Sequence, residues 1–551
     1  MKMTMYIRNK KPGFRLFVLL CVLGYMPNQL KAQLDAPRLL PVEHQEARRY
    51  EAYLLEQEDR WEHGSVQPRM SSRAYQESKK DTVFQRSKYA GTWWYDRMFA
   101  TNLLAAEQGD KWALEADMLV DLSIGREFAG GDYTWLNTRG ARLQGTIGSK
   151  IAFSSEIYEN QVQLPYYLDS FVHRTTIIPG QGLTRVFGAD GWSYGNAQSY
   201  IAYRPNTYLN VQFGQGRHFL GNGYRSLLLS DASFPAPYFR LQAEVGPLQY
   251  TYWIHQYTDI YTPPLSYLLG YRQKFNAMGY LNWKVSKRFE IGLFQSVVWQ
   301  ADDIAGIRRG LPWQYLNPFI FFHPVQFASG SEGNLLMGLN TQYRIAKRTF
   351  AYGQFVFDEM RIADFFSQNG AAVNKYGGQM GLKSHQAFGV DGLFLQTEIN
   401  MVRPYTYTHW TTLTNYGHYG QSLAHPSGAN FREFLVLADY RMPRGWFFQT
   451  KAIYIQQGLD TAGINFGSDV NQSYVSAPGG FNSTGVWILQ GQKSQTWHLE
   501  MLFGRVINPK TNLQVEARCI LRQQGTEIGS RQTVWLTLGL RSALRNLYSD
   551  F

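Results

Sequence analysis

The sequence predicts an all-β protein: an outer-membrane antiparallel β-barrel of about 18 strands, preceded by a small N-terminal helical periplasmic region. Three observations predict this fold. Stretches of about ten residues alternate between apolar and polar side chains, as strands with two different faces do. Very short turns alternate in phase with long excursions of the chain. A secretory signal opens the chain, and no later stretch is apolar enough for a transmembrane helix.

Residues 1–32 are predicted to be the signal peptide. Basic residues between Lys2 and Arg15 precede an apolar run, Leu16–Met26, that is too short to cross a bilayer. Cleavage is expected after Ala32, and an uncleaved membrane anchor is the alternative. The segment contains six of the 54 Lys and Arg and none of the 42 Asp and Glu, so its removal lowers the formal net charge from +12 to +6. The mature chain therefore lacks the strong basic character of a nucleic-acid-binding protein. It keeps only Cys519, which excludes an intrachain disulfide.

Residues 33–110 differ in composition from the remainder of the chain and are expected to form the helical periplasmic region. Val42–His63 is rich in Glu, Gln, Arg, Ala and Leu, and its large apolar residues recur at nearly helical spacing. A second, weaker helical run is expected at Thr101–Gln108.

Residues 111–551 are expected to form the barrel. In the first strand Leu114, Ala116 and Met118 alternate with Glu115 and Asp117, which places one set on lipid and the other in the lumen. The expected strands begin at Trp112, Thr134, Lys150, Asn196, Thr207, Pro237, Pro247, Phe275, Arg288, Gly333, Arg348, Asn374, Val390, Phe431, Gly445, Gln495, Thr511 and Arg531. Because this number is even, the start of the first strand and the end of the last strand are both expected on the periplasmic side.

The short turns assign one end of the barrel to the periplasm, because periplasmic turns are short and extracellular loops are longer. They lie near Gly148–Lys150, Arg204–Asn206, Gly246–Pro247, Ser286–Arg288, Ala346–Arg348, Gly389–Asp391, Met442–Gly445 and Asn508–Thr511. A large soluble all-β protein is the alternative, since it would also show alternation and turns.

Charged residues inside the strands predict the character of the lumen. Those on the polar phase are Arg240, Glu244, Asp358, Glu398 and Arg518. A Lys or Arg that faces lipid at mid-bilayer costs about 2–4 kcal/mol, so these side chains are expected to face inward. The lumen is therefore expected to be polar or plugged.

One segment, Gly214–Asp231, stands out as a candidate binding site. It leaves a strand for a long loop, and its glycines follow neither the dinucleotide fingerprint nor the phosphate-loop pattern. Donors, acceptors and aromatic faces for a polyol or an acidic sugar come from Arg217, His218, Asn222, Tyr224, Arg225 and Asp231. The alternative is that the glycines supply tight bends, while the Arg and Asp residues pair inside the lumen.

A second segment, Trp313–Val325, is apolar and aromatic within a long excursion. Such a run would not stay exposed to water, so it is expected to fold back into the barrel mouth or to plug it. His323, which precedes a proline, is expected to be structural.

No enzymatic chemistry is predicted, and neither a metal nor a cofactor is expected. Asp302 and Asp303 are adjacent, so as neighbours in a strand they would point apart. The 11 His residues show no metal-binding spacing, and no nucleophile elbow occurs. A hydrolase site assembled from residues distant in the sequence is the alternative.

The segment Gly191–Asp231 resembles the RemB-type gliding-motility proteins of Bacteroidota, which are related to the Wzi-like capsule-assembly family. The likeness rests on Tyr194–Tyr200 and Gly223–Asp231, and Ser226–Ser230 followed by Pro235 matches the Wzi-like pattern. His218 and Phe219 stand where that pattern has a Trp pair, so the RemB type is the closer match. Two further segments resemble the same group: Tyr315–Pro318 with the following Gly330–Asn334, and Leu547–Phe551.

The resemblance implies an outer-membrane barrel of about eighteen strands with a helical periplasmic part. In the capsule family such a barrel acts as a surface lectin that holds exported polysaccharide on the cell. The RemB group is linked by its name to gliding or surface adhesion.

The predicted function is non-enzymatic binding or organisation of surface or capsular polysaccharide. The alternatives are a gliding-motility or adhesion component that anchors partner proteins, and a diffusion porin. The expected partners are outer-membrane lipid, the polysaccharide and the outer-membrane barrel assembly machinery, to which the terminal aromatic Phe551 points. Motility or adhesion proteins are partners under the first alternative, and no nucleic acid is expected.

Overall fold

The computed structural model describes residues 36–57, 62–71, 73–79, 89–109, 111–264, 270–302, 307, 312–318, 333–359, 364, 366, 368–480, 482–542 and 545–551. The predicted signal peptide and His323 lie outside the described residues. The elements before the barrel are α2 (His44–Glu56), β1 (Val66–Gln67), α3 (Arg73–Ser78), α4 (Trp93–Phe99) and β2 (Leu104–Gln108). Within the described ranges no helix is long and apolar enough to cross a membrane.

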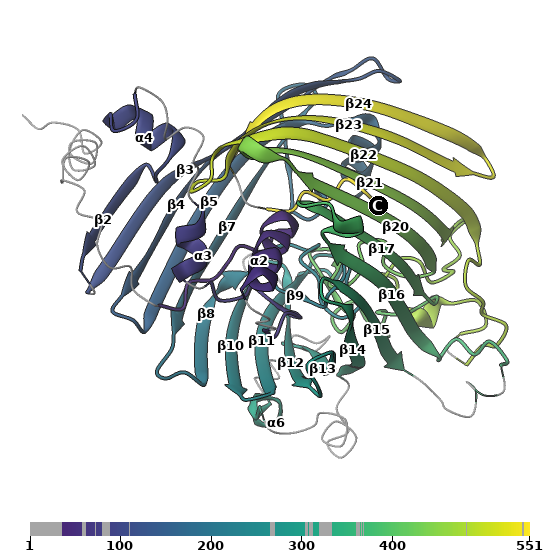
Figure 1. The fold of residues 1–551 in the computed structure, drawn as a ribbon. Coiled ribbons are helices and arrows are strands. Elements are labelled where there is room, and N and C mark those ends of the chain that lie inside the picture. Colours follow the sequence, from purple (N-terminus) through teal and green to yellow (C-terminus); the bar gives the residue numbers. More distant parts are fainter. Residues whose placement is uncertain are drawn as a thin grey trace, which may run out of the picture.

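Eighteen antiparallel strands close into a barrel, as the sequence predicts (Figure 1). They are β3 (Trp112–Glu127), β4 (Tyr133–Ile147), β5 (Ile151–Gln163), β7 (Gly191–Tyr203), β8 (Leu209–Gly216), β10 (Ala236–Val245), β11 (Leu248–Asp259), β12 (Arg272–Lys284), β13 (Phe289–Gln300), β14 (Asn334–Ala346), β15 (Thr349–Glu359), β16 (Lys375–His385), β17 (Leu393–Val402), β20 (Phe431–Arg441), β21 (Trp446–Leu459), β22 (Gln492–Asn508), β23 (Leu513–Thr526) and β24 (Gly529–Arg541). The last strand pairs with the first, with Trp535 opposite Glu127 and Arg541 opposite Asp121. This pairing closes the sheet into a ring.

Shorter elements lie in the connections. They are α5 (Tyr166–Thr175), β6 (Arg185–Phe187), β9 (Phe219–Leu220), α6 (Trp313–Leu316), η3 (Ala387–Gly389), β18 (Gly417–His418), β19 (Gln421–Ser422), η4 (Pro443–Gly445) and η5 (Tyr474–Ser476).

The alternation gives each wall strand an outer and an inner face. On β3, Met118 and Ile124 are exposed on the outer face, whereas Asp117 and Asp121 are buried on the inner face. The inward placement of the strand charges is confirmed by the burial of Arg240, Asp358 and Glu398. An apolar outer band around a polar interior is the arrangement of an outer-membrane barrel, and the protein is an outer-membrane protein.

Exposed aromatic side chains mark one membrane interface. They lie beside the short turns and include Trp112, Tyr203, Tyr208, Trp283, Tyr343, Trp446 and Phe448. Aromatic girdles of this kind sit at the headgroup level of membrane barrels. Because the periplasmic turns of outer-membrane barrels are short, the short turns are assigned to the periplasmic end, and the opposite end is called the long-loop end below.

The alternation of short and long connections fails beside the closing pair of strands. At the long-loop end β3 joins β4 through residues 128–132, and β23 joins β24 through Glu527 and Ile528 alone. The prediction that every connection at this end is long is wrong for these two. Here α5 is attached to the rim of the barrel: the backbone N–H of Tyr166 donates to the carboxylate of Glu127, at the end of β3, at 2.6 Å.

The helix predicted at Thr101–Gln108 is also wrong, because this segment contains the strand β2. It pairs with β3, with Leu104 opposite Ala116 and Gln108 opposite Trp112. β24 pairs with the same edge of β3 only from Asp121 onward, so the first half of that edge needs another partner. The unpaired backbone groups at this edge of β3 favour a strand as partner, and this outweighs the weak helix propensity of residues 101–108.

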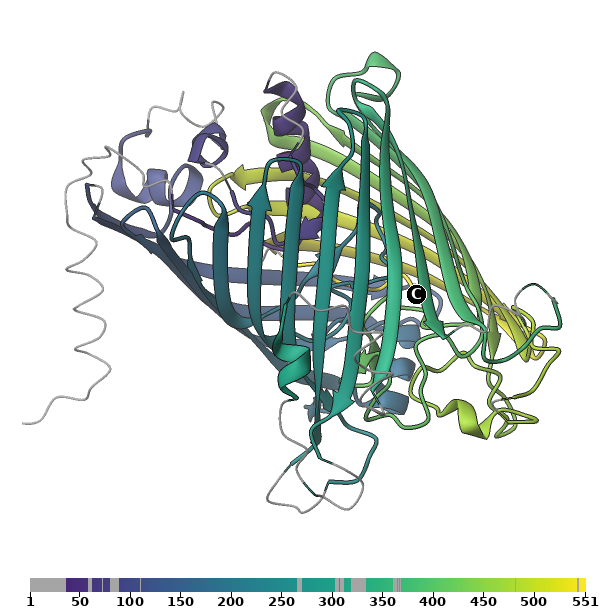
Figure 2. The same cartoon turned by 90° about the horizontal axis from the view of Figure 1, so that it is seen from below.

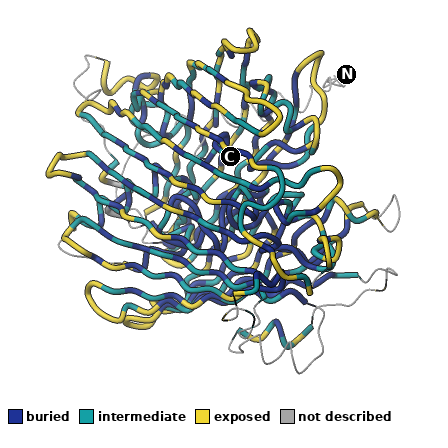
Figure 3. The backbone as a smooth tube through the Cα atoms, turned by 90° about the vertical axis from the view of Figure 1, so that its right-hand side faces the viewer, coloured by how far each residue is buried: buried dark blue, intermediate teal, exposed yellow. Residues whose placement is uncertain are grey.

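The lumen is filled by segments of the chain itself (Figures 1 and 3). α2 closes the periplasmic mouth, where Arg48 donates to Asp439 at 3.1 Å and Arg49 to Asn512 at 2.8 Å. Deeper inside, β1 pairs with β9, and the loop 217–235 that contains β9 is almost wholly buried. The C-terminal tail, residues 545–551, also enters the lumen. The prediction of a polar or plugged lumen is confirmed.

The apolar segment that begins at Trp313 lies outside the barrel, so the prediction that it enters or plugs the mouth is wrong for its described residues. α6 rests on the lipid-facing side of β11–β13 (Figure 2). Tyr315 is buried there against Trp299, at 5.2 Å between ring centroids, and Tyr252 donates to the carbonyl of Tyr315. The outer wall of the barrel is apolar, so Tyr315 is buried there instead of in the polar lumen.

The end of the chain does not extend the last strand. β24 ends at Arg541, and Phe551 packs against Phe171 of α5 at 5.2 Å between ring centroids. The terminal aromatic residue is therefore used inside the lumen. Recognition by the barrel assembly machinery stays a prediction.

Candidate functional site

The segment Gly214–Asp231 turns from the end of β8 into the lumen. Its run Leu227–Leu229 is buried together with Leu220 in the largest apolar cluster of the protein, which also contains Tyr280 and Tyr407 from the surrounding wall and loops. Burying such a run is worth about 1.5–3 kcal/mol per Leu side chain, so an inward course is favoured over exposure at the cell surface.

Polar groups of the wall hold the backbone of this segment. Gln354 of β15 donates to the carbonyl of Leu220 and accepts from the N–H of Leu227, both at 2.8 Å. The carboxylate of Glu398 on β17 accepts from the N–H groups of Tyr224 at 2.8 Å and Arg225 at 3.1 Å. The segment is therefore fixed to two strands of the barrel through hydrogen bonds that a buried loop requires.

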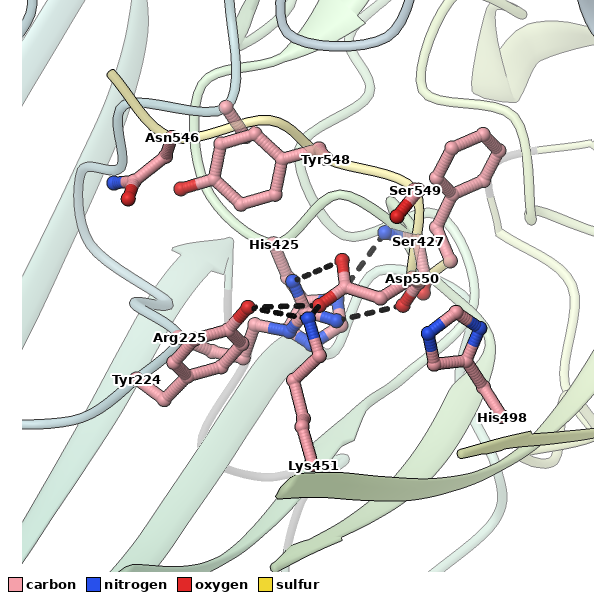
Figure 4. A network of polar contacts seen from close by, with 12 residues as sticks. Tyr224, Arg225, His425, Ser427, Lys451, His498, Asn546, Tyr548, Ser549 and Asp550 are labelled. Atoms are coloured by element: carbon pink, nitrogen blue, oxygen red, sulfur yellow. Dashed lines mark hydrogen bonds and ion pairs between the residues drawn. The ribbon is translucent and has the colours of Figure 1, made fainter. Parts of the chain in front are cut away.

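Arg225 is the centre of a buried network of charges (Figure 4). Its guanidinium pairs with Glu433 of β20 at 3.1 Å and with the carboxylate of Asp550 in the C-terminal tail at 3.3 Å. It also donates to the backbone carbonyl of Asp550 at 2.8 Å. The other carboxylate oxygen of Glu433 contacts His425 at 2.8 Å. The network thus joins the loop, the wall and the tail.

Asp550 has two further donors. Lys451 of β21 binds its carboxylate at 2.6 Å, and the Tyr224 hydroxyl donates to it at 2.8 Å. Lys451 also pairs with Glu500 at 2.9 Å. Burial acts to raise the pKa of Asp550, but Arg225 and Lys451 outweigh it and hold this pKa well below its usual range. The carboxylate is therefore ionised and bound at neutral pH.

Asp231 holds the tail at a second place. Its carboxylate accepts from the Asn546 amide at 2.6 Å and from the Tyr548 hydroxyl. Burial raises the pKa of Asp231. Because both partners belong to the tail, Asp231 serves the same attachment as Tyr224 and Arg225.

The other three predicted residues point elsewhere. Arg217 donates to the carbonyl of Gly180, in the connection that follows α5. His218 contacts His255 of β11 at 3.2 Å between ring nitrogens. Asn222 is buried, and among the described residues neither atom of its amide has a hydrogen-bond partner.

The six predicted residues therefore do not form one open site. None is more than 8% exposed, and three of them are bound to the C-terminal tail. The sequence offered the alternative that Arg and Asp residues pair inside the lumen, and Arg225 does pair with Asp550 there. The partner of Arg225 could not be identified by spacing, since it lies 325 positions further along the chain.

A second group of residues lies at the long-loop end, and sequence reasoning missed it. This exterior aromatic group consists of Tyr261, Trp410, Tyr419, Tyr474 and Trp487, all at least partly exposed. Aromatic residues in long excursions were the only available signal, and the chain is rich in them elsewhere.

Hydrogen bonds lock together the loops that carry this group. Asp259, at the end of β11, accepts from the hydroxyls of Thr262 and Thr412, both at 2.6 Å. Ser473 donates to the carbonyl of Trp410 at 2.8 Å, which joins a third loop. The aromatic faces are thus presented by a rigid surface, which lowers the entropy cost of binding a ligand.

Neither group resembles a metal centre. In the ranges that the structure describes, no group of three or more His, Cys, Asp or Glu residues could hold a metal ion.

The sequence matches no known protein family, and no curated protein matches it. Among solved structures, the chain is similar to Wzi of Escherichia coli, whose structure is described as an outer membrane protein involved in group 1 capsule assembly and a carbohydrate-binding β-barrel. The identity is 15%, 78% of this chain and 85% of that chain are covered, and the TM-score is 0.49.

Porin-like barrels match over a similar length. OprD of Pseudomonas aeruginosa is 9% identical, with 78% of this chain and 94% of that chain covered and a TM-score of 0.41. OccAB2 of Acinetobacter baumannii is 11% identical, with coverages of 77% and 97% and a TM-score of 0.40. At these identities the likeness concerns the fold, and the RemB-type resemblance stays a prediction.

Proposed function

We propose that this outer-membrane barrel binds a surface polysaccharide at its long-loop end and holds it on the cell without cleaving it. The observation that carries the proposal is the contrast between a lumen filled by the chain itself and a rigid, aromatic-bearing outer surface. A filled lumen argues against a diffusion porin. Flat aromatic faces beside hydroxyl and carboxylate groups are suited to the apolar and polar sides of sugar rings.

The six residues predicted from the sequence are buried beneath the long-loop end, and under this proposal they support that surface. Tyr224, Arg225 and Asp231 bind the tail. The loop that carries them also contacts the loop between β17 and β20, because the backbone N–H of Ser230 donates to the carbonyl of Leu423 at 2.8 Å. Direct contact between a glycan and Tyr224, Arg225 or Asp231 would require the tail to leave, because residues of the tail occupy the polar groups of these three side chains.

The proposal is tested by the location of the surface glycan in cells that lack the gene. We expect glycan to appear in the medium while its total amount is unchanged. Complementation with the wild-type gene should restore retention, whereas the variant Trp410→Ala/Tyr474→Ala/Trp487→Ala should not. Phe388→Ala, which removes an aromatic side chain that is 91% exposed at the periplasmic end, is the matched control and should restore retention fully.

Unchanged retention of every surface glycan in the deletion strain would contradict the proposal. Loss of spreading or adhesion with normal glycan retention would instead favour the anchoring of motility or adhesion proteins.

A further inference from the structure

An open groove lies on the lipid-facing side of the wall, away from the lumen and from the exterior aromatic group. Its volume is about 450 Å³, and it crosses the consecutive strands β20–β24 in the half of the wall nearer the long-loop end (Figure 1). Phe434 and Trp497, which line it, are 48% and 59% exposed, whereas their neighbours Glu433 and His498 are buried on the inner face. The groove therefore opens toward the membrane and not into the barrel.

Cross-strand pairing arranges the lipid-facing side chains here in three rows. The row nearest the long-loop end is polar and consists of Arg432, Gln456 and Gln495. The next row is aromatic and consists of Phe434, Tyr454 and Trp497. The third row is aliphatic and consists of Val436, Ala452, Leu499, Leu521 and Val534. Toward the middle of the bilayer the wall thus changes from polar to aromatic to aliphatic, as a lipid changes from its head group to its chains.

Ala452 opens the floor of the groove. It stands between Val436 and Leu499 in the aliphatic row, and its methyl group fills much less space than the side chains on either side. Tyr454 and Trp497 form a border of the groove, because their rings lie 4.2 Å apart between centroids with 31° between their planes. A hydrocarbon chain that lies in this depression gains dispersion contacts that a flat wall would not offer.

The margin of the groove at the long-loop end is positively charged. Arg432, at the start of β20, and Lys493, at the start of β22, are both exposed on the outer face. Among the described residues, neither side chain has a hydrogen-bond or ion-pair partner. Every residue of β20–β24 is described, and the lipid-facing positions of these strands contain one further cation, Arg505 at the periplasmic end, and no carboxylate.

Two carboxylates lie in the connections beside this margin. Asp460, after β21, accepts from the backbone N–H groups of Phe466 at 2.6 Å and Asp469 at 3.1 Å, so its oxygens are already bound. Glu527, at the tip of the hairpin between β23 and β24, is exposed, and in the described part of the chain it pairs with neither cation. Two free cations against one free carboxylate leave the margin positive.

We propose that this groove binds one phosphorylated glycolipid of the outer leaflet, the class to which lipopolysaccharide belongs. Arg432 and Lys493 bind its phosphate, since guanidinium and ammonium groups both form charge-assisted hydrogen bonds with phosphate. Gln456 and Gln495 face the sugar hydroxyls of the head group, and one acyl chain lies over Ala452. A glycolipid fits better than a phospholipid, because amides stand beside the cations and because the long-loop end faces the glycolipid leaflet.

The proposal does not depend on glycan binding by the exterior aromatic group. The groove is formed by the wall strands, whereas the exterior aromatic group is carried by the loops. Gln456 is already oriented by the wall, because its amide donates to the hydroxyl of Tyr454 at 3.0 Å.

The test is binding of deep-rough lipopolysaccharide, which keeps the phosphorylated lipid head but lacks the polysaccharide, to the purified protein in detergent, measured by native mass spectrometry. We expect one lipid per barrel. Removal of the phosphates with phosphatase should weaken binding about tenfold. Arg432→Gln/Lys493→Gln should weaken binding of the intact lipid to the same extent and leave binding of the dephosphorylated lipid unchanged. Lys287→Gln/Arg288→Gln, at exposed positions of a periplasmic turn, is the matched control and should bind as the wild type does.

A second pair of variants tests the floor of the groove. Ala452→Phe fills the depression and should weaken binding of the intact and the dephosphorylated lipid alike. Ala438→Phe adds the same side chain on the lipid-facing side of β20 but outside the groove, so binding should be unchanged. Heat-modifiable mobility in electrophoresis verifies that each variant is folded.

Three results would overturn the proposal. The first is equal binding of intact and dephosphorylated lipopolysaccharide by the wild type, which needs no variant. The second is equal binding by the Arg432→Gln/Lys493→Gln variant and its control, or by the two alanine variants. The third is binding of phosphatidylglycerol as tight as that of lipopolysaccharide, because the cations would then attract any anionic lipid.

Discussion

The outer and inner faces of the same strands are built on different principles. On β22, Leu499 points to lipid, whereas its neighbour Glu500 points inward and pairs with Lys451 of the adjacent strand β21. The outer face needs only apolar side chains at every second position, because lipid accepts any of them. The inner face carries buried charges, and each of these needs a particular partner with a particular geometry. The wall therefore follows from a local pattern, whereas the filled lumen depends on contacts between distant segments.

The largest effect is expected from removing the central cation of the inner face. Arg225→Met leaves Glu433 and Asp550 buried without their main partner, and breaking a buried ion pair on one side costs about 3–5 kcal/mol. Unfolding in urea, followed by electrophoretic mobility, measures this loss. The control is Arg432→Met, which changes an exposed residue next to Glu433 and should shift the free energy of unfolding by less than about 0.5 kcal/mol. Equal stabilities of the two variants would contradict the contrast between the faces.

A somewhat smaller effect is expected from placing a charge on the outer face. Leu538 of β24 is 56% exposed on the lipid-facing side, and Leu538→Arg should cost about 2–4 kcal/mol in a bilayer. Ile528→Arg, at the tip of the hairpin between β23 and β24, is the control and should cost little, because this residue lies beyond the strands. Folding efficiency into lipid vesicles compares the two. A tolerated Leu538→Arg would show that this face does not meet lipid.

A moderate effect is expected at the periplasmic mouth. Glu51 of α2 pairs with Lys383 at 2.7 Å and with His385 at 3.4 Å on β16. Glu51→Gln weakens these contacts and should cost about 1–3 kcal/mol, because Lys383 stays buried. Protease cleavage within α2 should become faster while the barrel stays folded. Unchanged cleavage would mean that other contacts hold the helix in the mouth.

The smallest effect is expected from mild acid. Since Arg225 and Lys451 outweigh burial and lower the pKa of Asp550, the tail contact contributes stability above the unfolded value of about 3.9 and loses it only as pH falls through the lower folded value. Between about pH 7 and pH 5 the tail should therefore stay bound, as measured by carboxypeptidase digestion of the folded protein. Asp550→Asn should be digested faster at neutral pH and show no further acid-dependent step from this residue. Release of the wild-type tail within this range would contradict the assigned contacts.

These comparisons also show which features could be predicted from the sequence. The eighteen strands and the inward placement of Arg240, Asp358 and Glu398 follow from period-2 alternation, which is a local property. The strand β2 could not be predicted, because it depends on the incomplete pairing of β3 with β24. The attachment of the tail depends on a contact between Arg225 and Asp550 that no local spacing encodes.

The exterior aromatic group shows the same limit at the long-loop end. Its members come from separate loops that are brought together by contacts such as that between Thr412 and Asp259. In the sequence each aromatic residue is one of many, so the group becomes visible only in the folded protein.

Direct binding of purified surface polysaccharide to the purified barrel, measured by isothermal titration calorimetry, tests the central claim most directly. We expect the wild-type protein to bind, the Trp410→Ala/Tyr474→Ala/Trp487→Ala variant to lose binding, and Phe388→Ala to bind as the wild type does. Absence of binding by the wild type, or equal binding by the triple variant, would contradict the claim that this barrel holds a glycan at its long-loop end.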